Sequence, residues 1–153
     1  MTKTTNIKQN LYDQCQLFID IRFHTIQHTI NDIQESLTSE TKSSAGDKHE
    51  TGRAMLQLER EKAGQQLAEI QKVNQLLSKI DVSKSSNSIG LGSIAYTTQA
   101  NYFVAVSAGE FTVAHEKFYA ISANTPIGRL LLGKITGDKI QFRDQDFEII
   151  TII

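Results

Sequence analysis

Residues 19–37, IDIRFHTIQHTINDIQESL, determine the fold of the first half of this chain. Their apolar side chains recur at alternating intervals of four and three residues: Ile19, Phe23, Ile26, Ile30, Ile33 and Leu37. This spacing is the heptad pattern of a helix that packs against another helix along one apolar seam. The stretch therefore predicts a long helix that needs a helical partner.

The partner is predicted in the segment that follows. Apolar residues recur there at intervals of seven, with one more between them: Leu56, Ala63, Leu67, Ile70 and Leu77. The polar stretch SSAGDKHETGRAM (43–55) separates the two seams, and no proline interrupts either of them. We predict an antiparallel coiled-coil hairpin over residues 1–82, with arms of about 50 Å at a rise of roughly 1.5 Å per residue.

The chain changes character after this hairpin. Residues 83–88, SKSSNS, form a polar linker, and residues 89–153 contain short apolar runs rich in β-branched and aromatic residues. Such runs are typical of strands. We expect strands at residues 93–99, 102–106, 117–122, 138–142 and 146–153.

A short helix is predicted between these strands, in the stretch NTPIGRLLLG (124–133). Thr125 is a suitable N-cap, Pro126 suits the first helical position, and Gly133 suits the position after the helix ends. The predicted fold class is α+β, with a helical hairpin followed by a small antiparallel β-sheet domain that carries one short helix.

Composition narrows the functional classes. The 153 residues include 16 basic and 17 acidic side chains, a formal net charge of −1, so the chain as a whole is not drawn to nucleic acid or anionic membranes. A single cysteine, Cys15, cannot form an internal disulfide and suits a reducing compartment. Neither a signal peptide nor an apolar run long enough to span a bilayer is apparent. We expect a soluble cytoplasmic protein that does not bind membranes.

Two acidic residues, Asp47 and Glu50, stand three apart where the second helix should begin. One interpretation is a capping box, in which each side chain accepts a hydrogen bond from the other residue's backbone N–H. The other is functional. Carboxylates one helical turn apart lie on the same face of a helix and can share one Mg²⁺ ion. Spacing alone leaves both interpretations open.

Two stretches of the chain resemble the bacterial Gre transcript cleavage factors. The first is ISANTPIGRLLLGKITGDKIQF (121–142), followed by the closing strand DFEIITI (146–152). Ten of its residues match the pattern of the family's C-terminal domain: Ser122, Pro126, Ile127, Gly128, Leu131, Leu132, Gly133, Lys134, Gly137 and Asp138. The second stretch is the predicted tip of the hairpin, residues 46–52, where Gly46, Asp47 and Glu50 coincide with the family's Gly-Asp-Leu-x-Glu-Asn-Ala motif.

The resemblance implies a transcription elongation factor that works on RNA polymerase. The C-terminal domain, similar to the FKBP fold, would dock at the rim of the polymerase's secondary channel, and the hairpin would pass down the channel. Asp47 and Glu50 would then help to hold a second Mg²⁺ at the polymerase active centre, which the free protein does not bind. The polymerase, not the factor, would cleave the 3′ end of the backtracked RNA.

The resemblance also implies contact residues. Three side chains beside the acids would meet RNA phosphates or acidic residues of the channel: Lys48, His49 and Arg53. Three residues at the start of the short helix would contribute to docking on the polymerase: Asn124, Thr125 and Pro126. The factor is expected to act as a monomer.

Three alternatives remain open. Thr51 stands where the family usually has Asn, and Ala54 where a tyrosine is common, which suits a regulator that occupies the channel without stimulating cleavage. The C-terminal domain could instead be a prolyl isomerase, which needs an apolar pocket lined by aromatic side chains. The heptad seam could also pair between chains in a plain coiled-coil assembly protein.

Overall fold

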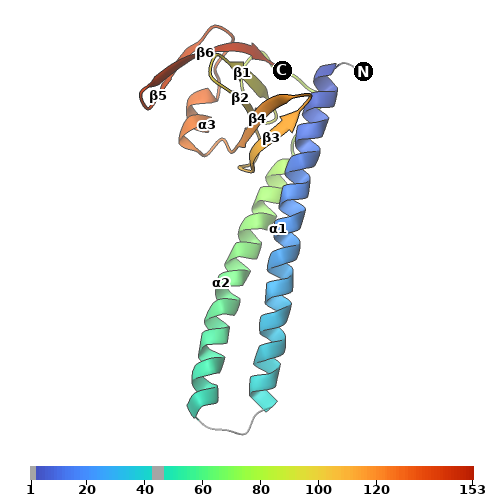
Figure 1. The fold of residues 1–153 in the computed structure, drawn as a ribbon, viewed down its shortest axis with the longest axis vertical. Helices are drawn as coiled ribbons and strands as arrows, with labels where there is room; N and C mark the ends of the chain where they lie inside the picture. The colour runs from blue at the N-terminus through green and yellow to red at the C-terminus, as the bar shows by residue number, and fades with distance from the viewer. Residues whose placement is uncertain (1–2, 43–46) are drawn as a thin grey trace. The chain divides into compact units, whose positions relative to one another are not determined.

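A computed structural model gives the fold of the chain (Figure 1). It describes the backbone of residues 3–42 and 47–153, and the side chains of residues 6–39 and 50–153. The chain divides into two compact units, one formed by Ile19–Asn74 and the other by Met1–Phe18 together with Gln75–Ile153.

The unit Ile19–Asn74 is a helical hairpin. It is formed by most of α1 (Lys3–Lys42) and α2 (Asp47–Ser78), which lie side by side and run in opposite directions (Figure 1). The predicted seam is confirmed, because Ile30, Ile33 and Leu37 of α1 are buried in one apolar cluster with Ala63 of α2. Three half-buried side chains pack against this cluster: Ile26, Leu56 and Leu67.

Burial of the seam is what stabilises the hairpin. Each isoleucine or leucine removed from water contributes about 1.5–3 kcal/mol relative to an exposed side chain. Threonines on the exposed faces do not break α1, because Thr25 and Thr29 donate their hydroxyl protons to the carbonyls four residues earlier, at 3.0 Å in each case. The sequence pattern and the local hydrogen bonds therefore favour the same long helix.

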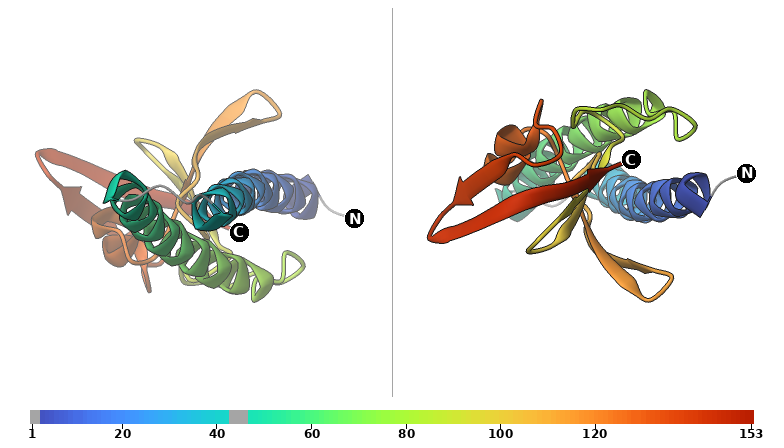
Figure 2. Two further views of the ribbon diagram at one scale, coloured as in Figure 1. Left: turned by 90° about the horizontal axis from the view of Figure 1, so that it is seen from below. Right: turned by 90° about the horizontal axis from the view of Figure 1, so that it is seen from above.

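The second unit contains a six-stranded sheet. The strands are β1 (Ile94–Thr97), β2 (Asn101–Val104), β3 (Gly109–Val113), β4 (Glu116–Ile121), β5 (Lys139–Phe142) and β6 (Gln145–Ile152). Their order across the sheet is β3-β4-β2-β1-β6-β5. Figure 2 shows the two outer hairpins, β3–β4 and β5–β6, extending from opposite edges of the twisted sheet.

The α+β class is confirmed, but the sheet is mixed instead of wholly antiparallel. β2 and β4 pair in parallel, with Phe103 opposite Ala120, whereas the other neighbours pair antiparallel. The parallel pair arises because β3 intervenes between β2 and β4 in the chain and lies on the outer side of β4. The sequence did not predict β3, so it gave no reason to expect this crossover.

The core of the second unit lies between the sheet and α3 (Pro126–Leu131). One cluster joins Leu131 of α3 to inward-facing residues of the strands and of the segment before β1: Ile89, Ala95, Val104, Ile140, Phe147 and Ile149. Phe103 and Phe118 are also completely buried. Both belong to the buried apolar interior of this unit.

The beginning of α1 and the end of α2 belong to this second unit. Leu11 and Cys15 of α1 and Leu77 of α2 are completely buried there. Cys15 is therefore placed as a small apolar side chain of this unit. Within the part of the chain that the structure describes, no helix has both the length and the apolar character needed to cross a membrane.

Candidate functional site

The candidate site lies at the end of the helical hairpin, where α1 ends at Lys42 and α2 begins at Asp47. The predicted tip, residues 46–52, falls partly within the described residues. Gly46 lies outside them, and so do the side chains of Asp47, Lys48 and His49, whose backbone is helical.

Asp47 and Glu50 lie in the first turn of α2. Residues three apart in a helix project from the same face, so the backbone brings these two positions together. The side chain of Glu50 is exposed. An exposed carboxylate in the first turn is also favoured by the positive end of the helix dipole, which gives acidic residues here a structural role beside the metal-binding interpretation.

Arg53 lies one turn further along α2 and contacts α1. Its Nη1 donates a hydrogen bond of 3.4 Å to the carbonyl oxygen of Leu37, and its side chain is half-buried. Leu37 belongs to the apolar cluster of the hairpin. Arg53 therefore holds the two helices together close to the two acidic positions.

Thr51 and Ala54 are two of the tip positions that differ from the residues usual in the Gre family, as Gly52 also does. Both are exposed on α2, next to Glu50 and Arg53. Neither belongs to the apolar cluster of the hairpin. Both side chains therefore lie outside the apolar packing between the two helices.

A second set of predicted residues lies at the start of α3. The side-chain oxygen of Thr125 accepts a hydrogen bond of 3.1 Å from the backbone N–H of Gly128, and its hydroxyl donates one of 2.7 Å to the carbonyl of Ser122. Pro126 follows at the first helical position. The prediction that Thr125 caps this helix is confirmed.

The turn before α3 is fixed by further contacts. The backbone N–H of Asn124 donates to the Ser122 hydroxyl at 3.2 Å, and the Asn124 side chain is exposed. A Cβ atom added to Gly128 would lie 2.2 Å from the Ser122 carbonyl oxygen, so the helix approaches this turn more closely than any side chain allows. Asn124 and Pro126 are thus exposed on a rigid turn.

Sequence reasoning missed two features of the described residues. The contact between Arg53 and Leu37 depends on how the two helices face each other, which no local pattern specifies. The other feature is the buried side chain of Lys8. A signal for it exists, because Lys8 stands three residues before Leu11 and seven before Cys15, spacings that put it on the same face of the helix as these two apolar residues.

The chain is similar to two solved structures. One is the crystal structure of the GreA factor homolog 1 (Gfh1) protein of Thermus thermophilus, with 19% identity and a TM-score of 0.35 over 86% of this chain and 94% of that chain. The other, the structure of the transcription factor Gfh1, has 18% identity and a TM-score of 0.34 over 99% of this chain and 95% of that chain. No protein-family model and no curated protein matches the chain. At these values the likeness carries no argument about function.

Proposed function

We propose that this chain is a transcription elongation factor of the Gre kind, which binds RNA polymerase and stimulates cleavage of backtracked RNA. One observation carries the proposal. α2 begins at Asp47, so that Asp47 and Glu50 occupy the first turn of the helix at the end of a hairpin, on one helical face. This is the placement that a factor needs if it presents two carboxylates to a partner.

The two carboxylates suit a magnesium ion chemically. Mg²⁺ prefers carboxylate oxygens and retains several water molecules, and Glu50 is exposed and therefore accessible to an ion held partly by a partner. In phosphoryl hydrolysis such an ion, when bound, stabilises the attacking or the leaving oxygen. The contribution of this chain would be to present two acidic residues one helical turn apart at the start of α2.

The neighbouring basic residues have a complementary role in this proposal. Lys48, His49 and Arg53 would face RNA phosphates or acidic residues of the polymerase channel, and their charge would offset the repulsion between phosphate and the two acids. For Arg53, the half-buried contact with Leu37 supports a role in positioning as well.

The second unit would provide the docking surface. Asn124 and Pro126 are exposed on the turn that Thr125 and Gly128 fix. A rigid turn loses little conformational freedom on binding, which favours its use in a protein interface. We therefore propose that residues 124–126 contact the polymerase.

The proposal is tested by removing both charges and keeping the cap. The double variant Asp47→Ser, Glu50→Gln retains the hydrogen bonds of a capping box, so the helical content measured by circular dichroism is expected to stay unchanged. With backtracked complexes of the organism's RNA polymerase, the double variant is expected to lose stimulated RNA cleavage. Glu59→Gln, Glu61→Gln is the matched control, because it removes two exposed acids further along α2 and should retain cleavage.

Two outcomes would contradict parts of the proposal. If the double variant cleaves as well as the unmodified protein, Asp47 and Glu50 are structural caps and the catalytic assignment is wrong. If the unmodified protein co-purifies with the polymerase and inhibits synthesis without shortening the RNA, the chain is a channel-binding regulator. The exposed Thr51 and Ala54 would then be the first positions to exchange for the family's residues.

A further inference from the structure

Lys8 carries a buried ammonium group. Only 2% of its surface is exposed, and its Nζ donates one hydrogen bond of 2.7 Å, to the backbone carbonyl of Lys84. Among the described residues, no carboxylate forms an ion pair with this ammonium group. Burial lowers the pKa of Lys8, because the charged form loses its hydration there. An ammonium group can donate three hydrogen bonds, so two donors remain for a ligand or water.

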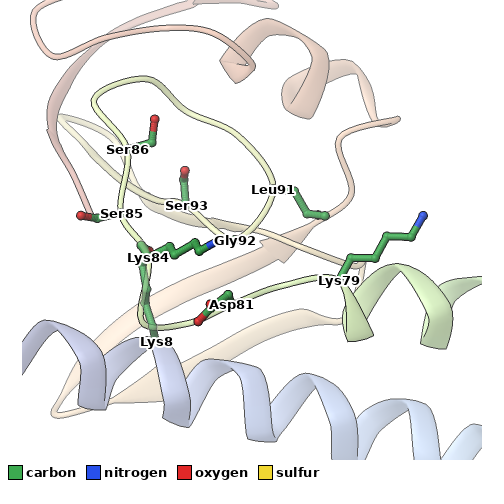
Figure 3. Close-up of a pocket in the computed structure, with 9 residues that line it drawn as sticks. All are labelled: Lys8, Lys79, Asp81, Lys84, Ser85, Ser86, Leu91, Gly92 and Ser93. Atoms are coloured by element: carbon green, nitrogen blue, oxygen red, sulfur yellow. The ribbon is translucent and has the colours of Figure 1, made fainter.

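A cavity of about 290 Å³ adjoins Lys8. Its wall comes from the start of α1 and from the segment between the end of α2 and β1 (Figure 3). The lining residues are Lys8, Lys79, Asp81, Lys84, Ser85, Ser86, Leu91, Gly92 and Ser93. All of them belong to the same compact unit. The volume is at the lower end of the range for ligand sites, which suits a small ligand.

A second unused donor lies in the same wall. Ser93 is 5% exposed, and its hydroxyl oxygen accepts a hydrogen bond of 3.0 Å from the backbone N–H of Gly90. No acceptor among the described residues takes the hydroxyl proton of Ser93. A buried hydroxyl proton without an acceptor is unfavourable, so a ligand that accepts hydrogen bonds would stabilise this side of the cavity.

The charges around the cavity favour an anion. Lys84 contributes a second ammonium group, and in Figure 3 its side chain extends along the cavity wall toward Gly92, whereas the Lys79 side chain points away from Lys8. Asp81 offsets one of these charges, since its carboxylate interacts with Lys84 and accepts hydrogen bonds from the backbone N–H of Ser83 at 3.0 Å and from the Ser83 hydroxyl at 2.5 Å. The lining residues still include three lysines against this one carboxylate. The cavity thus combines an excess of positive charge with free hydrogen-bond donors.

We propose that this cavity is a binding site for a small phosphate-type anion, held by Lys8, Lys84 and the hydroxyl of Ser93. A tetrahedral oxyanion offers several acceptor oxygens at once, and it supplies the negative charge that the buried ammonium lacks. Inorganic phosphate and a phosphomonoester share this chemistry. The cavity does not include Asp47 or Glu50. The proposed anion site therefore does not depend on the proposed role in transcription.

Titration with inorganic phosphate at constant ionic strength tests the proposal. We expect saturable changes in the amide NMR signals of Gly92 and Ser93, with chloride as the reference anion. Lys8→Met, which keeps the volume and removes the charge, should weaken binding roughly tenfold or more, because it removes a charge-assisted hydrogen bond. Lys139→Met is the matched control: it removes one positive charge from an exposed position of the same unit and should leave binding unchanged.

Thermal unfolding gives an independent readout. At a phosphate concentration of about ten times the Kd of the unmodified protein, the Tm of the unmodified protein and of Lys139→Met should rise by about 3 °C, and the Tm of Lys8→Met by about 1 °C or less. In the absence of phosphate, Lys8→Met should be at least as stable as the unmodified protein, since it buries no unpaired charge. If Lys8→Met does not fold, the NMR titration of the unmodified protein with phosphate and chloride still tests whether the cavity binds phosphate.

Adenosine 5′-monophosphate, compared with adenosine, distinguishes the two sources of the anion. Tighter binding of the monophosphate than of inorganic phosphate would identify a phosphomonoester as the ligand, and equal or weaker binding would identify free phosphate. The proposal is wrong if neither anion shifts the signals of Gly92 and Ser93, or if chloride at the same ionic strength has an equal effect.

Discussion

Arg53 and Leu37 join the two helices of the hairpin, through a hydrogen bond of 3.4 Å from the guanidinium Nη1 to the backbone carbonyl oxygen. The bond lies one turn beyond Glu50 and at the edge of the apolar cluster that contains Leu37. A residue that the sequence placed among the ligand contacts is therefore also part of the structure that positions the acids. The two roles can be separated by experiment.

Substitution of Arg53 by alanine should loosen the beginning of α2. Loss of the hydrogen bond to Leu37 and of the packed side-chain stem should destabilise the hairpin by about 1 kcal/mol. Amide hydrogen exchange of residues 51–56 should become faster, while exchange near Ile70 stays unchanged. Lys62→Ala, at an exposed position of the same helix, is the control and should alter neither.

The same variant distinguishes positioning from ligand contact. If Arg53→Ala lowers stimulated cleavage but leaves hydrogen exchange unchanged, Arg53 acts by contacting RNA or the polymerase channel. If neither measurement changes, the bond to Leu37 contributes nothing measurable and the positioning role is wrong.

Most of the fold follows from local patterns in the sequence. The intervals between Ile19 and Leu37 predicted α1, because a heptad seam needs no information about distant residues. Thr125 and Pro126 predicted the start of α3 for the same reason, since a cap is a contact between near neighbours. Five of the six strands were found from short apolar runs flanked by turn residues.

The missed elements have identifiable physical causes. β3 (Gly109–Val113) does alternate, with Phe111 and Val113 less exposed than Glu110 and Thr112, but it has only five residues and begins with a glycine, a residue that indicates a turn. Its hairpin turn, Ala114 and His115, lacks the asparagine and glycine that usually mark a two-residue turn. Lys8 was missed because a lysine is rarely buried, although its spacing from Leu11 and Cys15 placed it on the buried face.

The sequence predicted the helix start that carries the candidate site, but not the role of its two acidic residues. Asp47 and Glu50 were placed at a helix start, and α2 does begin at Asp47. The choice between a cap and a metal ligand depends on the partner that the carboxylates face. Neither the spacing nor the helix supplies that information, which is why the charge-removing variant is needed.

Gly128 should tolerate no side chain. Alanine there would place its Cβ 2.2 Å from the Ser122 carbonyl oxygen and 2.9 Å from Oγ1 of Thr125, which the backbone of the turn cannot accommodate. We expect Gly128→Ala to lower the free energy of unfolding by about 2 kcal/mol or more, measured by chemical denaturation. Arg129→Ala, at the next and exposed position, should have little effect. Equal stabilities of the two variants would contradict the close approach.

Two substitutions of Thr125 measure how much the cap of α3 contributes to stability. Thr125→Ala removes the hydrogen bond to the Gly128 amide and should destabilise the unit by about 1 kcal/mol, whereas Thr125→Ser keeps the hydroxyl and most of the stability. If the alanine and serine variants unfold at the same denaturant concentration, the cap is energetically unimportant.

The turn between β3 and β4 should become more stable when its residues suit its backbone. Ala114 and His115 both have positive φ, 52° and 67°, as in a type I′ turn. Residues other than glycine and asparagine are strained there, so Ala114→Asn, His115→Gly should stabilise the unit by about 1 kcal/mol in thermal unfolding. Ala100→Gly is the control: Ala100 is not among the residues with positive φ, so glycine should destabilise that turn.

The thiol of Cys15 should be unreactive in the folded protein. It is completely buried, and burial raises its pKa from the ordinary value of 9.0 to about 12. At pH 8 the shift of about three units makes the thiolate roughly a thousandfold rarer than in the unfolded chain. Alkylation by iodoacetamide should therefore be slower by about that factor in the folded protein than in denaturant. Comparable rates in both would contradict the burial.

The same shift predicts how stability depends on pH. Because the pKa is higher in the folded state, the thiol stabilises the folded state fully below pH 9, and this contribution is lost as the pH rises toward 12. The unfolded thiol ionises in this window and the folded one does not. The free energy of unfolding therefore falls by about 2 kcal/mol between pH 8 and pH 10.5. Cys15→Ala cannot titrate, so the stability advantage of the unmodified protein over this variant should shrink between pH 8 and pH 10.5. Lysines and tyrosines titrate in the same range but equally in both proteins, so a constant difference would show that the Cys15 thiol ionises as readily in the folded state.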